Sequence, residues 1–541
     1  MVPHEIQEYP IFHALRRHAR PFVFWPPAVF LLAALCWSLI DFGGFHARVT
    51  AANDWLLSRF DWAFSLGSFF AVVLLTWVTI SPLGNVRIGG PDAKPILSRW
   101  NWFSITLCTT VAIGILFWAA AEPMFHVNSP PDFAGVDARS SEAAQFALST
   151  MFMHWTITPY ALYSVPALAF ALAHFNLGKP YSLSGPLSLV FGRAATGRTG
   201  DIIDAVGLYA LVAGVAASLG VGVMTLAGGV EKLFGVSDSI VLRFFIVVAI
   251  VALFVVSSIS GIQRGIKYLS DINVKFFFAL VLFVLIAGPT GAILALGGQS
   301  LVTYVTDFLP ASLALGERAG SEWMHDWTVF YFANWLAWAP ITALFLGRIS
   351  VGYTVREFLL FNLAAPAAFS FLWMTVFSGA AVLIDGQGGT LSAALDAGGA
   401  DAVIYALFEA LPLTGIIVSA FILLTFISFV TAMDSNTHSI SSVCLRGSAS
   451  EADVQRHAMP IKIFWGVLVG AVAWVMTSTT GIDGVRMLSN LGGAPGLLIM
   501  LAMGVGIIVM RVRWLDEIRA GQNTGASTLD QVNEKPGSQA S

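Results

Sequence analysis

The chain has 541 residues, of which 57% are hydrophobic and only 11% are charged, and its formal net charge is -4. Soluble domains carry about 25% charged residues, so this composition excludes a soluble protein and predicts that much of the surface faces lipid. Cys36, Cys108 and Cys444 show neither disulfide nor metal-site spacing. The phosphate-binding motif GxxxxGK[ST] is absent, and we expect no cofactor, no metal and no nucleic-acid partner.

Apolar runs of about 20 residues, each long enough to cross a bilayer, recur along the chain. Twelve are expected, at 22–40, 61–80, 100–121, 143–174, 202–229, 240–260, 270–296, 326–347, 355–384, 412–433, 461–480 and 487–511. The shorter segments 302–316 and 386–410 are expected to be interfacial helices or outer loops. The chain is thus divided into an N-terminal segment (1–21), a transmembrane domain (22–512) and a polar tail (513–541) that we expect to be disordered.

The loops alternate in charge. Lys and Arg are concentrated on the side that holds the N-terminus, with residues such as Arg16, Arg87 and Arg264, and are fewer on the other side. The positive-inside rule therefore places both termini in the cytoplasm, and an even number of spans agrees. Twelve spans fit either two six-helix halves or an inverted five-plus-five repeat with two extra helices, and Gly and Pro interruptions favour the repeat.

The segment 326–340, DWTVFYFANWLAWAP, carries the clearest functional signal. At 100° per residue, Trp327, Tyr331, Trp335 and Trp338 fall within about 60° of arc on one helix face. Ordinary helix packing or an interfacial aromatic belt would also place rings together, but this stripe runs through about three turns. A quaternary ammonium has no N–H donor, and aromatic ring faces are the groups that select it.

A second aromatic set lies in HWTITPYALY, which holds Trp155, Tyr160 and Tyr163. Pro159 is placed to open this helix, so that the rings face inward. The two sets together predict two walls around a small cationic organic solute, and hence a transporter.

Several motifs resemble the betaine/carnitine/choline transporter family. The segment 326–340 is similar to the family signature, and the further matching segments are SPLGNVRIGGPDAKP (81–95), AEP (121–123), GRISVGYTVREF (347–358) and FVTAMDS (429–435). They are colinear over roughly residues 20–510. The resemblance implies secondary active transport, a bacterial inner-membrane location and often a homotrimer. It also implies an all-α, LeuT-like fold, in which helices 3–12 form the inverted repeat after two extra N-terminal helices.

The resemblance also implies a substrate box made of Trp155, Tyr160 and Tyr163 with Trp335 and Trp338. Tyr160 stands where members more often have Trp, and two tryptophans of the family's Trp-x-Trp-Trp are replaced by Phe332 and Asn334. The Asn334 amide could contact a substrate carboxylate or hydroxyl, or it could bond a neighbouring helix.

The expected solute is a quaternary ammonium such as glycine betaine, choline or carnitine. A sulfonium analogue such as dimethylsulfoniopropionate is the alternative, since an aromatic box recognises the onium group and little else. A membrane-embedded enzyme is the remote alternative, because it would require converging His, Asp and Glu residues that the sequence does not indicate.

The coupling ion is the other open question. Sodium-coupled relatives have a glycine-rich break in their third membrane span, which corresponds to 100–121 here, and a Thr-Ser pair in their tenth, which corresponds to 412–433. Here CTTVAIGIL (108–116) keeps only Gly114, and Ala432 follows Thr431 where Ser is expected. We therefore expect weak or absent sodium dependence.

Ionisable residues in the spans suggest other forms of coupling. Lys275 could replace sodium electrostatically, as an Arg does in a sodium-independent exchanger branch of the family, or it could snorkel to the interface. Asp434 could pair with Lys275, bind a proton or cap a helix break. His154 and His438 leave proton coupling open, because histidine titrates near neutral pH.

Overall fold

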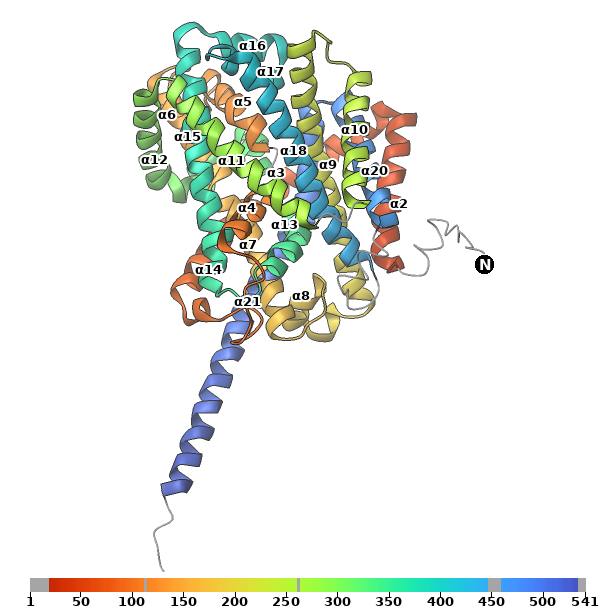
Figure 1. Cartoon of the computed structure of the whole chain (residues 1–541), viewed down its shortest axis with the longest axis vertical. Coiled ribbons are helices and arrows are strands. Elements are labelled where there is room, and N and C mark those ends of the chain that lie inside the picture. The colour runs from red at the N-terminus through yellow and green to blue at the C-terminus, as the bar shows by residue number, and fades with distance from the viewer. Residues whose placement is uncertain (1–18, 111–113, 260–262, 446–458, 534–541) are drawn as a thin grey trace, which may run out of the picture.

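The computed structural model describes residues 19–110, 114–259, 263–445 and 459–533, which form an almost entirely helical body (Figure 1). Helices satisfy their own backbone hydrogen bonds, which lipid cannot do. The helices are α2 (Pro21–Ile40), α3 (Phe42–Ile80), α4 (Arg99–Thr110), α5 (Gly114–Asn128), α6 (Ser141–Trp155), α7 (Ile157–Ala171), α8 (Ser184–Phe191), α9 (Arg198–Phe234), α10 (Ile240–Ile259), α11 (Gln263–Ala287), α12 (Thr290–Ser312), α13 (Phe330–Ile349), α14 (Val355–Leu359), α15 (Ala365–Gly388), α16 (Thr390–Gly398), α17 (Ala400–Glu409), α18 (Thr414–Cys444), α20 (Met459–Thr479) and α21 (Ile482–Asn533).

The total number of membrane spans agrees with the sequence, but the members differ, because α12 is counted as a span, whereas the predicted span 240–260 is counted only as a shorter apolar helix, Ile240–Leu253. Within the described ranges, 11 helices are long and apolar enough to cross a bilayer, and a twelfth span results if α4 and α5 are counted as one. These two helices meet at a bend of 55°. The prediction of an all-α polytopic membrane protein is confirmed, whereas the inverted five-plus-five repeat stays a prediction.

One predicted span was wrong at its end. The run 270–296 crosses the boundary between α11 and α12, because Gly288 and Pro289 separate the two helices. Proline cannot continue a helix from the preceding turn. The segment 302–316, expected to be interfacial or a loop, mostly belongs to α12, which is itself apolar enough to span.

The tail also differs from the prediction. Helix α21 continues to Asn533 and projects from the helical body, so residues 513–533 are helical where disorder was expected (Figure 1). Extending an existing helix avoids the cost of nucleating a new one. In addition, the sequence contains no proline from 496 to 535 that would end it.

Two interrupted helices supply most of the rings described below. Helix α6 ends at Trp155, and Thr156 breaks the helical path with φ -115° and ψ -112° before α7 begins. Pro159 lies in the first turn of α7, where the missing N–H is tolerated. This confirms that the fourth predicted span is interrupted. In the eighth predicted span, 326–347, a π-helical turn, η6 (Met324–Val329), precedes α13.

Helix α13 lies inside the body and packs against α7, α9 and α21. Its contact with α21 depends on Gly496, where a Cβ atom would overlap the backbone of Leu336. Small residues allow such close backbone approach between membrane helices. The close approach of the tryptophan-rich helix to α21 therefore depends on glycine at this interface, and Gly493, which faces the backbone of Ala333, is a second such position.

Candidate functional site

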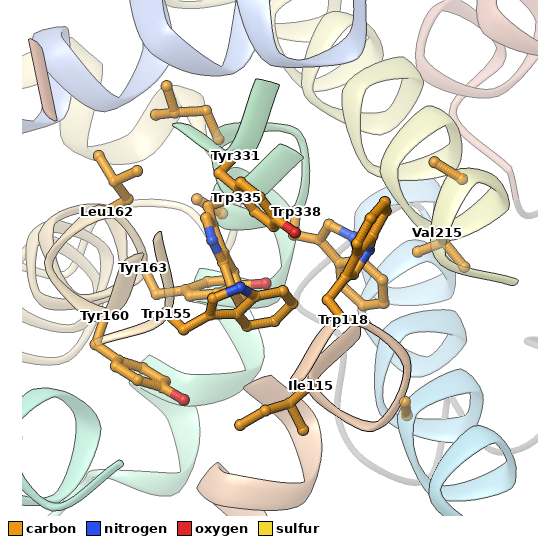
Figure 2. Packing of buried hydrophobic residues seen from close by; sticks show 14 of the residues in the cluster. Ile115, Trp118, Trp155, Tyr160, Leu162, Tyr163, Val215, Tyr331, Trp335 and Trp338 are labelled. Carbon is orange, nitrogen blue, oxygen red and sulfur yellow. The ribbon is translucent and has the colours of Figure 1, made fainter. Parts of the chain in front are cut away.

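Trp335 is the centre of a buried aromatic cluster formed by α6, α7 and α13 (Figure 2). Its ring centroid lies 5.4 Å from Trp155, 6.3 Å from Tyr160 and 5.7 Å from Tyr163. The Trp155 and Tyr163 rings meet it nearly at right angles, at 85° and 79°. The structure thus brings together residues that the sequence separates by about 180 positions, as the two-wall prediction requires.

The rings of this cluster touch one another. A cation bound between two ring faces lies within about 6 Å of each centroid, so the faces must stand well apart to admit it. The edge-on contact between Trp155 and Trp335 leaves no such gap between them. In this structure the box is closed, and binding requires these rings to separate.

The four rings of the predicted stripe on 326–340 do not face one common site, because they contact different parts of the protein. Trp327 falls in the π-helical turn, which disturbs the assumed 100° step, and its ring lies 4.6 Å from the Arg486 guanidinium carbon. The Trp338 indole turns towards α9 and donates to Ser218 Oγ at 3.2 Å. Figure 2 shows Trp338 on the Trp118 side of the cluster, away from Tyr160. Of the stripe, Tyr331 and Trp335 meet the rings of α6.

Tyr331 joins the aromatic cluster to a buried polar network. Its ring centroid is 5.1 Å from Trp155, and its hydroxyl donates to Glu122 Oε2 at 2.5 Å. The Trp155 indole donates to the same oxygen at 2.8 Å. Glu122 therefore holds one ring from each wall.

Two histidines complete this network. His154 Nδ1 lies 2.6 Å from Glu122 Oε1, and His154 Nε2 lies 2.9 Å from Thr328 Oγ1. His126 Nε2 lies 3.3 Å from Glu122 Oε1. The side chains of the carboxylate and both imidazoles are 0% exposed. We refer to Glu122, His126 and His154 as the acid–histidine cluster.

This cluster was not predicted from the sequence, and the expectation that no His and Glu residues converge was wrong. Trp118, Glu122 and His126 repeat every four residues, which places them on one helix face, and that spacing was the available signal. Gly114, one turn earlier, is the one glycine that remains where sodium-coupled relatives have a glycine-rich break. A Cβ atom there would lie 2.7 Å from the Trp155 ring, so the glycine makes room for the box.

The acid–histidine cluster has the ligand types of a metal site, with its ligand atoms within 4.8 Å of one another. Two atoms bound to one tetrahedral zinc stay about 3.3 Å apart, given zinc–nitrogen and zinc–oxygen distances near 2.0 Å. The 2.6 Å separation of His154 Nδ1 and Glu122 Oε1 is shorter and typical of a hydrogen bond. The geometry therefore favours a shared proton over a metal.

Two predicted site residues contact neighbouring helices. The Tyr160 hydroxyl lies 2.8 Å from Ser370 Oγ on α15. The half-buried Asn334 accepts from Ser489 Oγ on α21 at 3.0 Å. The structure thus favours the interhelical alternative for the Asn334 amide.

Replacing Asn334 with Ala should therefore destabilise the protein by about 1 kcal/mol, because Ser489 loses its partner. Thermal melting of the purified protein measures this. The matched variant Ser489→Ala should cost a similar amount, and the double variant should cost little more than either one. Additive losses, or a loss of solute binding larger than the loss of stability, would instead support a substrate contact at Asn334.

The residues proposed for coupling are not gathered at the aromatic cluster. Lys275 is 65% exposed and pairs with Asp271 at 2.7 Å, which favours the snorkelling alternative. The Thr431 hydroxyl donates within its own helix to Ile427 and Ser428, and buried Ala432 offers no side-chain oxygen. The side chain of Asp434 lies outside the described residues.

Comparisons with known proteins give the relatives of this chain. A family profile described as BCCT, betaine/carnitine/choline family transporter, matches residues 22–513. The glycine betaine transporter OpuD of Bacillus subtilis is 30% identical over 485 residues, which cover 89% of this chain and 92% of the relative. Glycine betaine transporter 1 of Vibrio parahaemolyticus is 32% identical over 498 residues, which cover 89% of this chain and 91% of the relative.

Another relative has a different printed substrate. The ectoine/hydroxyectoine transporter of Virgibacillus pantothenticus is 33% identical over 450 residues, covering 82% of this chain and 87% of the relative. Among solved structures, a substrate-bound, outward-open Na+-coupled sialic acid symporter matches at 14% identity and a TM-score of 0.48. That match covers 83% of this chain and 85% of the other.

Proposed function

This chain belongs to the betaine/carnitine/choline transporter family, and we propose that it carries a small quaternary-ammonium solute across the inner membrane by alternating access. It is a multi-pass membrane transporter, not an enzyme. Glycine betaine is the first solute to test, since two relatives are named for it.

The observation that carries this proposal is the convergence of Trp155, Tyr160 and Tyr163 on Trp335. These electron-rich rings come from two sides of a buried site, and their faces attract a desolvated cation by about 2 kcal/mol or more. Glu122, directly behind Trp155 and Tyr331, adds a carboxylate to the same region. A positively charged onium group fits this environment better than an anion.

A competition panel tests the proposal. Binding of glycine betaine, choline, carnitine, dimethylsulfoniopropionate and ectoine to the purified protein would be measured through tryptophan fluorescence. We expect the methylated onium compounds to bind and proline to fail. Sodium chloride and proline serve as controls for ionic strength and for a zwitterion without a methylated cation. Binding of ectoine alone would contradict the onium assignment.

Sodium should not be required. Thr431 has no neighbouring side-chain hydroxyl at Ala432, so a set of oxygen ligands for a hard cation is incomplete there. Uptake into proteoliposomes should change by less than about tenfold, equivalent to 1.4 kcal/mol, when potassium replaces sodium on both sides. A steep dependence on the sodium concentration would contradict this. Sodium-independent substrate exchange is compatible with the same result.

We propose the remaining family features on the same basis. The LeuT-like inverted repeat, the cytoplasmic placement of both termini and a homotrimeric assembly come from the sequence and the family resemblance. The excess of Lys and Arg on the N-terminal side supports the orientation. Protease accessibility of the N- and C-terminal segments in right-side-out and inside-out vesicles tests that orientation.

A further inference from the structure

The acid–histidine cluster is a buried charge without a fixed counter-ion. In the part of the chain that the structure describes, the ion pairs of Glu122 are made with His126 and His154 alone. Neither imidazole carries a permanent charge, unlike the ammonium of Lys or the guanidinium of Arg. A carboxylate at 0% exposure is costly unless its charge is balanced. One added proton, shared among these three side chains, would neutralise it.

The groups that face the cluster are mostly neutral. The Trp155 indole and the Tyr331 hydroxyl donate to Glu122 Oε2, and Thr328 contacts His154. The Arg486 guanidinium stands behind Trp327: that ring lies 4.6 Å from the His126 ring and 4.6 Å from the Arg486 guanidinium carbon. Arg486 thus faces the cluster through an aromatic side chain without making a hydrogen bond to the carboxylate.

A small cavity gives the cluster a route towards solvent. His154 and Thr328 line it together with Asp307 and Arg318, which form a partly exposed ion pair at 2.6 Å. Its volume of about 30 Å³ is enough to hold a water molecule, which needs at least about 10–15 Å³. A proton could therefore reach His154 without passing through the aromatic box.

The cluster also connects the elements that must move for the box to open. Glu122 belongs to α5, the second half of the bent pair. His154 lies one residue before the end of α6, beside the break at Thr156, and contacts Thr328 in the π-helical turn. The His154 carbonyl accepts from the Trp335 indole at 3.0 Å. The protonation state of Glu122 thus bears directly on the hydrogen bonds that it accepts from Trp155 and Tyr331, and a movement of His154 would shift the carbonyl that holds Trp335.

We propose that Glu122, His126 and His154 bind a proton that is cotransported with the solute and replaces sodium as the coupling ion, which rests on the proposed function of the box. The proton enters from the outer solution, is shared between the Glu122 carboxylate and the imidazoles, and leaves to the cytoplasm with the solute. No covalent bond of the solute is changed.

Proteoliposomes of phosphatidylethanolamine and phosphatidylglycerol test this. Radiolabelled glycine betaine is offered in sodium-free potassium buffer, with valinomycin holding the membrane potential at zero and the interior about one pH unit more alkaline. One proton per zwitterionic solute allows up to about tenfold accumulation, the free energy of one pH unit. Pyranine inside the vesicles should report acidification that depends on betaine.

Glu122→Gln retains the size of the side chain, and its single amide oxygen can still accept from Trp155 and Tyr331, but the side chain cannot give up or take the shared proton. It should lose both accumulation and acidification, and the pH dependence of betaine binding should flatten. His126→Gln, which leaves the two contacts of Glu122 with the rings in place, should weaken accumulation in the same direction. His174→Gln is the matched control, because His174 stacks on Phe170 and lies outside the cluster.

The outcomes separate this inference from the proposed function. Wild-type protein that exchanges betaine but ignores the pH gradient overturns proton coupling and leaves the onium transporter intact. A Glu122→Gln protein that folds and still accumulates betaine against the gradient also overturns it. If Glu122→Gln does not fold, unchanged accumulation of betaine by His126→Gln would overturn proton coupling instead. Wild-type protein that neither binds nor exchanges any compound of the panel contradicts the proposed function itself.

Discussion

Replacing Trp335 with Ala should weaken glycine betaine binding by about 30-fold or more. Trp335 contacts the rings of Trp155, Tyr160 and Tyr163, so its removal takes away one wall and loosens the packing of the other. A desolvated cation–π contact contributes about 2 kcal/mol, which corresponds to roughly 30-fold in the dissociation constant. Equilibrium binding of radiolabelled betaine to the purified protein measures this change.

Two further variants make that result specific. Trp335→Phe keeps a ring of weaker quadrupole and should lose less affinity than the alanine variant. Trp55→Ala removes the same residue type from a position that is 58% exposed and should leave binding intact. Trp338→Ala tests the second family position, whose indole faces α9 in this closed structure. Wild-type affinity in both Trp335 variants would show that the box lies elsewhere.

Replacing Gly496 with Ala should cost about 1–3 kcal/mol, the usual penalty for overpacking. The added methyl group would overlap the backbone of Leu336 in α13, and backbone cannot move aside as a flexible side chain can. Helices α13 and α21 would have to separate, which displaces the helix that carries Trp335. Thermal melting followed by size-exclusion chromatography should show a lower midpoint and less folded protein.

Gly298→Ala provides the matched control. Gly298 is also helical, but it is exposed on α12, and a Cβ atom there would meet nothing within 4 Å. This change should be neutral or slightly stabilising, because Ala is a better helix former than Gly. Equal melting midpoints for the two variants would mean that the α13–α21 contact adjusts more easily than its geometry implies.

The closed box and the acid–histidine cluster suggest how binding and coupling are related. The rings that must separate for the solute are held by hydrogen bonds to Glu122 and to the His154 carbonyl. A ligand shifts a conformational equilibrium only through its different affinities for the two states. Here the solute would favour the separated rings, whereas the proton would change the contacts that hold them together.

Much of the architecture was predictable from local properties of the sequence. The apolar runs predicted the spans because hydropathy over about 20 residues is a local property. Gly288 and Pro289 marked a boundary that the run 270–296 overlooked, although the signal was present. The tail after residue 513 has a polar composition, but it follows a long helix directly, and composition alone does not report a helix that is already nucleated.

The aromatic site was only partly predictable. The sequence indicated Trp155, Tyr160, Tyr163 and Trp335 as rings of one site, because their spacing and the family resemblance agree. It placed Trp327 and Trp338 on the same face as Trp335, and there the structure differs. The π-helical turn rotates the first residue relative to a regular helix, and α13 lies between α7 and α9, so rings about 60° apart meet different helices.

By itself, the sequence determined a polytopic helical transporter of the betaine/carnitine/choline family and the aromatic residues suited to an onium solute. These features depend on composition, local periodicity and motifs. Only the tertiary structure decided that Glu122 and His126 from one bent span meet His154 from another, and that Lys275 stays at the surface. Such contacts depend on how separate helices pack. Glu122 and His154 are 32 positions apart, so no local pattern in the sequence indicates that their side chains meet.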